Sequence, residues 1–167
     1  MKRKSTYKEI CKLTLAAAAI GVFSASAAEA VEIKDVLDSY VEATVLPTYS
    51  QMSDSAIEFN KAVAKLKESA SDENLAKAAA AWSKVRTSWE RSEAFLFGPA
   101  AFASLDPNLD SWPLDQSQLD SLIKAINEGR ISIDAGYVRG GLGAAFRGFH
   151  AAEYLLFREG KVRKAAE

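Results

Sequence analysis

Residues 71–97 read SDENLAKAAAAWSKVRTSWERSEAFLF, and they decide the fold class because they have the start, the periodicity and the end of one amphipathic helix. Ser71 is a good helix N-cap, and two acidic residues follow it in the first turn. Gly98 and Pro99 mark the end of the helix. Large apolar residues recur on one face at helical spacing, namely Leu75, Trp82, Trp89 and Leu96. The stretch therefore predicts a helix over residues 71–97.

Three further segments on either side of this stretch also have helical patterns. Apolar residues recur every three or four positions over 33–70, which indicates one long helix or two stacked helices, kinked or split at Pro47. A capping box at Asp115 and Gln118 starts a short helix that Gly129 can close. A last helix should run from about residue 138 or 143 to 157.

The remaining pattern completes the fold prediction. Residues 98–113 lack helical periodicity and contain three of the four prolines, which predicts a long loop. No segment has a convincing strand pattern. We therefore expect an all-α fold, an up-and-down helical bundle of about four helices, over residues 29–160.

The first 28 residues have the three parts of a secretory signal peptide, which we expect to be removed. Five basic residues precede an apolar run over 13–23, and small residues follow at 24–28. This run is well short of the roughly 20 residues that a membrane-spanning helix needs, and no later stretch is long and apolar enough to span a membrane. The only cysteine, Cys11, lies in this segment, so we expect a chain without disulfides, typical of a bacterial periplasm.

The chain without its signal peptide is acidic. The signal peptide carries five of the 21 basic residues and one of the 22 acidic residues, which leaves a net charge of about −5. Such a balance argues against nucleic acid or an anionic membrane surface as the partner and mildly favours cations.

Ionisable residues lie on the apolar faces of two predicted helices. Arg86 and Glu93 share the apolar face of the helix predicted at 71–97. His150 and Glu153 share the apolar face of the last predicted helix, which ends at residue 157. A carboxylate in such a position needs an opposing cation, a metal ion or a water-filled cleft. If the two helices face one another, these four residues form one cluster with Glu90 at its edge.

His150 and Glu153 stand one helical turn apart, close enough to hold a single metal ion. Two ligands do not complete a site, because zinc takes three or four and iron often combines histidine with carboxylates. The candidate additional ligands are Glu93, Glu90 and Asp110. The alternative is a purely structural cluster in which Arg86 neutralises the glutamates and His150 is a core histidine.

Three segments of the sequence resemble the imelysin-like family. Residues 148–157, GFHAAEYLLF, match its G-x-H-x-x-E signature, while residues 82–99, ending in SEAFLFGP, and the loop DSWPLD at 110–115 resemble its other characteristic segments. The resemblance implies a bacterial protein built of helical bundles, periplasmic or associated with the outer membrane, and linked to iron regulation and iron uptake. It also implies that His150 and Glu153 are the metal-binding pair, with Glu93, Asp110 and Trp112 in segments that line the same pocket. We assign the pocket around them to Arg86, Glu90, Trp112 and Gly148.

The chain departs from this family in its length. Imelysin-like proteins are usually about twice as long, with two related halves and a pocket between them, so the sequence corresponds to the first half only. We expect that this half acts alone, self-associates to replace the missing half, or comes from a truncated gene. The basic tail at 161–167 should fray.

Three functions remain open at this point. The first is a periplasmic metal-binding protein, with iron favoured over zinc and with envelope iron-uptake components as partners. The second is a zinc-dependent peptidase, but HExxH and HxxEH are both absent because Tyr154 follows Glu153 and the chain has no second histidine. The third is a structural or interaction module without a metal. Enzymatic activity is therefore uncertain, and a binding role is the expectation.

Overall fold

The structure is a computed structural model that describes residues 31–166. The predicted signal peptide and Cys11 lie outside the described residues. Of the described residues, 31–36 belong to one unit and 37–166 to a second unit, which contains the core and the candidate site. Within residues 31–166, no helix is long and apolar enough to cross a membrane.

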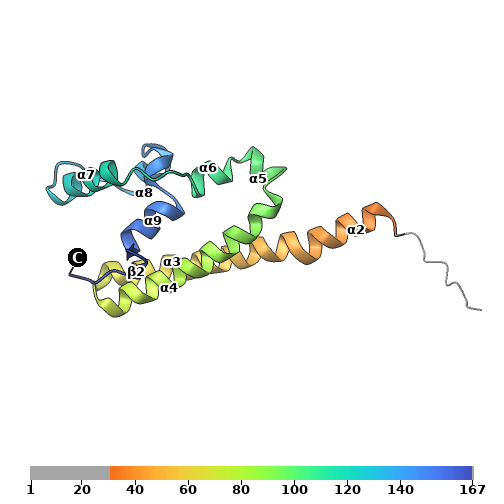
Figure 1. Ribbon diagram of the computed structural model, residues 1–167, viewed down its shortest axis with the longest axis horizontal. Coiled ribbons are helices and arrows are strands. Elements are labelled where there is room, and N and C mark those ends of the chain that lie inside the picture. Colours follow the sequence, from red (N-terminus) through yellow and green to blue (C-terminus); the bar gives the residue numbers. More distant parts are fainter. Residues whose placement is uncertain (1–30, 167) are drawn as a thin grey trace, which may run out of the picture. The chain divides into compact units, whose positions relative to one another are not determined.

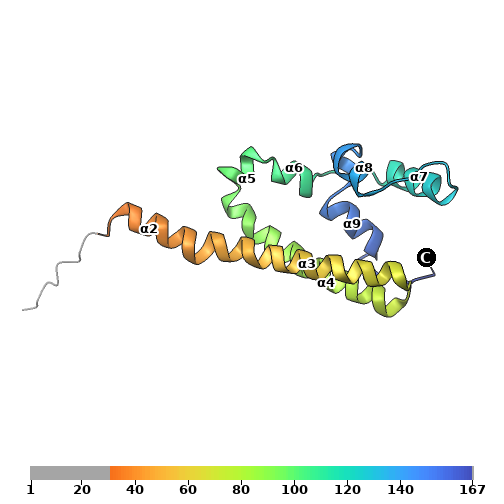
Figure 2. The same cartoon turned by 180° about the vertical axis from the view of Figure 1, so that it is seen from behind.

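Two long helices dominate residues 37–92. α2 (Ile33–Tyr40) passes through one turn of π-helix (Val41–Val45) into α3 (Leu46–Glu68), so the expected break near Pro47 takes the form of a π-turn just before it. α4 (Asp72–Ser92) returns antiparallel to α3, and Figures 1 and 2 both show the two helices side by side. The hydroxyl of Ser71 caps α4 by accepting a hydrogen bond from the amide of Asn74.

The second half of the chain is made of shorter elements. A 3₁₀ turn (Glu93–Phe95) follows α4 and is succeeded by α5 (Pro99–Phe102), α6 (Leu105–Leu109), α7 (Gln116–Asn127) and α8 (Ala135–Gly140). A further 3₁₀ turn (Ala144–Phe146) leads into α9 (Phe149–Leu156), which packs against α4. Two short antiparallel strands, β1 (Phe157–Arg158) and β2 (Lys161–Val162), end the fold.

The all-α class is confirmed, and four local predictions need correction. The last helix is not continuous, because glycines interrupt it and the chain is helical only over α8 and α9. α4 ends at Ser92 rather than at residue 97. The predicted loop at 98–113 contains two short helices, and two short strands occur where none was expected. The tail that was expected to fray contains β2, and Lys164 and the amide of Ala165 both contact the carboxylate of Asp72.

The hydrophobic core lies where α3, α4 and α9 meet. Small residues on α4, Ala78 and Ala79, are fully or almost fully buried and let the neighbouring helices approach closely. Trp82 packs edge to face on Phe157, with ring centroids 5.4 Å apart. Its indole N–H donates to the carbonyl of Phe149 at 3.2 Å, which ties the first residue of α9 to α4. This packing holds the face of α9 that carries His150 close to α4.

Candidate metal centre

A close backbone contact brings the loop after α6 beside the start of α9. Gly148 has a φ of +86°, a conformation that L side chains rarely adopt. A Cβ at this position would collide with the backbone carbonyl of Leu109, so glycine is required by both conformation and space. Leu109 precedes Asp110, and Gly148 lies two residues before His150. The contact between Leu109 and Gly148 therefore brings Asp110 close to His150.

Asp110 is the centre of the resulting cluster. Its side chain is only 6% exposed, and both of its carboxylate oxygens have partners. Arg86 forms an ion pair with Oδ1, and the indole N–H of Trp89 donates to Oδ2 at 2.7 Å. Nε2 of His150 lies 3.0 Å from Oδ1. The arginine supplies the compensating charge that a buried carboxylate requires.

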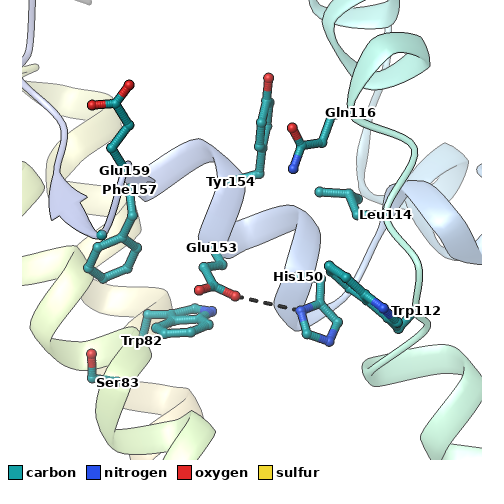
Figure 3. A pocket seen from close by; sticks show the side chains of 11 residues that line it. Trp82, Ser83, Trp112, Leu114, Gln116, His150, Glu153, Tyr154, Phe157 and Glu159 are labelled. Carbon is teal, nitrogen blue, oxygen red and sulfur yellow. Dashed lines mark ion pairs between the residues drawn. The ribbon is translucent and has the colours of Figure 1, made fainter.

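His150 faces a second carboxylate on its other side. Its Nδ1 lies 3.5 Å from Oε2 of Glu153, one turn further along α9. The ring of Trp112 packs beside the imidazole, with centroids 4.7 Å apart, as Figure 3 shows. The side chain of His150 is 19% exposed and that of Glu153 is 49% exposed, so the pair is open to solvent at the glutamate.

A pocket of about 410 Å³ opens over this pair. Figure 3 shows Trp82, Trp112 and Phe157 around Glu153 and His150. The full lining consists of Trp82, Ser83, Trp112, Leu114, Gln116, His150, Glu153, Tyr154, Phe157, Glu159 and Gly160. The sequence predicted that Glu153 would face a cation, a metal ion or a water-filled cleft. In the structure Glu153 lines a cleft.

The spacing of the two donor atoms fits a metal ion. Two donors that bind one metal at about 2.1 Å lie about 3.4 Å apart in tetrahedral geometry and about 3.0 Å apart in octahedral geometry. The separation of 3.5 Å between Nδ1 of His150 and Oε2 of Glu153 is close to the tetrahedral value. An imidazole nitrogen and a carboxylate oxygen are also common ligands of iron and zinc. The residues present therefore fit the group that the sequence predicted.

The other predicted ligands lie apart from this pocket. In the part of the chain that the structure describes, the one group of three or more acidic, histidine or cysteine ligands within 4.8 Å of one another is Glu93, Asp106 and Asp110. Asp106 was missed in the sequence, because the loop was not predicted to be helical and its position one turn before Asp110 was not visible. Glu93 does not line the pocket of His150 and Glu153.

Charge crowding marks the carboxyl of Glu93. Desolvation raises its pKa above the ordinary value of 4.5, and the carboxylates of Glu90 and Asp110 raise it further, against a smaller opposite effect of Arg86. Glu90 is half exposed and forms an ion pair with Arg86 at 2.5 Å. The predicted site residues thus divide between the pocket and a separate acidic group of Glu93, Asp106 and Asp110. Arg86 pairs with Asp110 of that group.

Comparisons with known proteins agree with the family resemblance. A family model described as imelysin, peptidase family M75, matches residues 45–167. Iron-regulated protein A of Synechococcus elongatus is 29% identical over 129 residues, which cover 77% of this chain and 33% of that protein.

Two crystal structures are also similar to this chain. An imelysin peptidase from Bacteroides ovatus is 38% identical with a TM-score of 0.62, over 75% of this chain and 36% of that one. An iron-regulated protein A precursor from Parabacteroides distasonis is 42% identical with a TM-score of 0.64, over 77% of this chain and 35% of that one. The chain spans about a third of the length of these relatives.

Proposed function

The chain belongs to the imelysin family, and we propose that it binds a metal ion through His150 and Glu153 in the bacterial periplasm. The observation that carries this proposal is the 3.5 Å separation of Nδ1 and Oε2 at the wall of a solvent-accessible pocket. The apolar residues around the pair lower the local dielectric, which strengthens the attraction between a cation and the carboxylate. Further ligands of the ion would have to come from the pocket that both residues line.

Iron is the favoured metal and zinc is the alternative. Nitrogen and carboxylate oxygen donors suit both metals. Two relatives are named iron-regulated protein A, which favours a role in iron handling together with envelope iron-uptake components. The export expected from the signal peptide and the word precursor in the name of one relative both support the periplasmic location.

Two protein ligands leave room for others. The pocket volume of about 410 Å³ corresponds to on the order of ten water molecules, far more than a bare ion needs. Waters, a small chelating ligand or donors from a second copy of the chain can fill the open positions. Metal stoichiometry and oligomeric state should therefore be measured together.

The two rival functions have weaker support. A zinc peptidase of the imelysin type would need a metal-activated water and a protein base, and this pocket offers one histidine and carboxylates. In the structural alternative, Arg86 would neutralise one or both of Glu93 and Glu153. Among residues 31–166 its ion pairs go instead to Glu90 and Asp110. Chelator-sensitive cleavage of a protein that Glu153→Gln abolishes would favour the peptidase.

Calorimetric titration with Fe²⁺ and Zn²⁺ tests the proposal. We expect the double variant His150→Ala, Glu153→Gln to bind at least tenfold more weakly than the unaltered chain, because both donors are lost. Glu58→Gln is the matched control, since Glu58 is an exposed glutamate on α3 paired with Lys84. Equal affinity of the double variant and the unaltered chain would rule out this site.

A further inference from the structure

We propose that Asp110 is a positioning residue for His150 and not a metal ligand, and that it makes Nδ1 the atom that coordinates the metal. The inference rests on the proposed function in one respect, because it concerns the same metal site. It reverses the role that the sequence pattern gave to Asp110. Three features of the structure carry it.

The first feature is that the two ring nitrogens of His150 face different carboxylates. Nε2 lies 3.0 Å from Oδ1 of Asp110, at hydrogen-bond distance, and Nδ1 lies 3.5 Å from Oε2 of Glu153. An ionised carboxylate can only accept a hydrogen bond, and a neutral imidazole has a single N–H. The shorter contact therefore places that N–H on Nε2 and leaves the lone pair of Nδ1 toward Glu153 and the pocket.

The second feature is that Asp110 is not free to turn toward the pocket. Arg86 engages Oδ1, Trp89 engages Oδ2, and the side chain is only 6% exposed. Asp110 is absent from the described residues that line the pocket, whereas His150 and Glu153 line it. The buried charge on Asp110 thus lies behind the imidazole, as seen from the pocket.

The third feature is that the ring itself is held in place. Trp112 packs against the imidazole at a centroid distance of 4.7 Å, and Gly148 fixes the approach of α9 to the loop that carries Asp110. A carboxylate that accepts from one ring nitrogen fixes the tautomer and increases the basicity of the other nitrogen toward a metal. Loss of such a partner typically weakens metal binding by about 10- to 100-fold.

Nitrogen-15 NMR of the imidazole tests the inference without any metal. His150 is the only histidine in the chain, so one set of ring signals reports the tautomer. We expect the neutral ring of the metal-free chain to carry its proton on Nε2. Asp110→Asn should weaken metal binding about 10- to 100-fold, because the amide lacks the negative charge of the carboxylate. Asp54→Asn, an aspartate on α3 outside the site, should change neither result.

Each outcome has a defined meaning. A ring that carries its proton on Nδ1 in the unaltered chain overturns the inference, as does a metal affinity that Asp110→Asn leaves unchanged. The first of these measurements needs no variant and stands even if Asp110→Asn fails to fold. If the ring carries its proton on Nε2 but the chain binds neither Fe²⁺ nor Zn²⁺, the proposed function is overturned. The orientation of the ring by Asp110 then still stands.

Discussion

Replacing Arg86 with methionine should lower the free energy of unfolding by about 3 kcal/mol, because it leaves the carboxylate of Asp110 buried without its cation. Breaking one side of a buried ion pair typically costs about 3–5 kcal/mol. The lower end applies here, because Trp89 still donates to the carboxylate and Nε2 of His150 lies 3.0 Å from it. Methionine keeps most of the side-chain volume beside Phe149, which the guanidinium overlies at 5.3 Å.

Urea denaturation followed by circular dichroism measures this effect. A loss of 3 kcal/mol changes the unfolding equilibrium by about two powers of ten. With a slope near 2 kcal/mol per molar urea, the midpoint should fall by about 1.5 M. Arg91→Met is the matched control, because Arg91 is an exposed arginine on the same helix, and it should change stability by no more than about 0.5 kcal/mol.

A double-mutant cycle identifies the cause of the loss. Adding Asp110→Asn to Arg86→Met removes the uncompensated charge, so the double variant should be more stable than Arg86→Met alone. Such non-additivity is expected for two groups in direct contact. If Arg86→Met costs no more than Arg91→Met, or if the two changes at positions 86 and 110 simply add, the ion pair does not organise the site as described.

Two further predictions concern the same region. Gly148→Ala should destabilise the chain by more than about 1 kcal/mol in thermal unfolding, because it combines an unfavourable φ with a collision at Leu109. Gly140→Ala is the control and should be nearly neutral, because a Cβ at this position meets open space. Glu93→Gln should stabilise the chain at neutral pH by less than about 1 kcal/mol, because the raised pKa means that the folded state disfavours the ionised Glu93 beside Glu90. This gain should disappear as the pH is lowered below 4.5, where the carboxyl is protonated in both states, and a gain that grows on acidification would contradict the assignment.

Local chemistry was sufficient to predict much of the helical part of the fold. The cap at Ser71 and the capping box at Asp115 both occur as hydrogen-bonded helix starts. The apolar face of α4 is buried through Leu75, Trp82 and Trp89. These features depend on residues within one or two turns of each other, so a single sequence contains them.

The break before α9 could not be predicted in the same way. The need for glycine at position 148 arises from contact with the carbonyl of Leu109, which lies 39 positions earlier in the sequence. Without that contact, the apolar periodicity continues smoothly through residues 142–157 and suggests one helix.

The same long-range contact hid the arrangement of the site. The pairing of His150 with Glu153 is a local spacing on one helix, and it was visible in the sequence. The position of Asp110 between Arg86 and His150 depends on the packing of the loop, so the sequence identified the residue but not its role. Asp106 was missed for a local reason, because α6 was predicted as a loop.

The most direct test of metal binding at this site is X-ray absorption spectroscopy of the chain loaded with one metal ion. With a single histidine in the sequence, scattering from one imidazole can come only from His150. We predict one imidazole nitrogen at about 2.0–2.1 Å together with carboxylate oxygen, and loss of the imidazole signal in His150→Ala. A coordination shell of oxygen alone, identical in the unaltered chain and in His150→Ala, would contradict the proposed site.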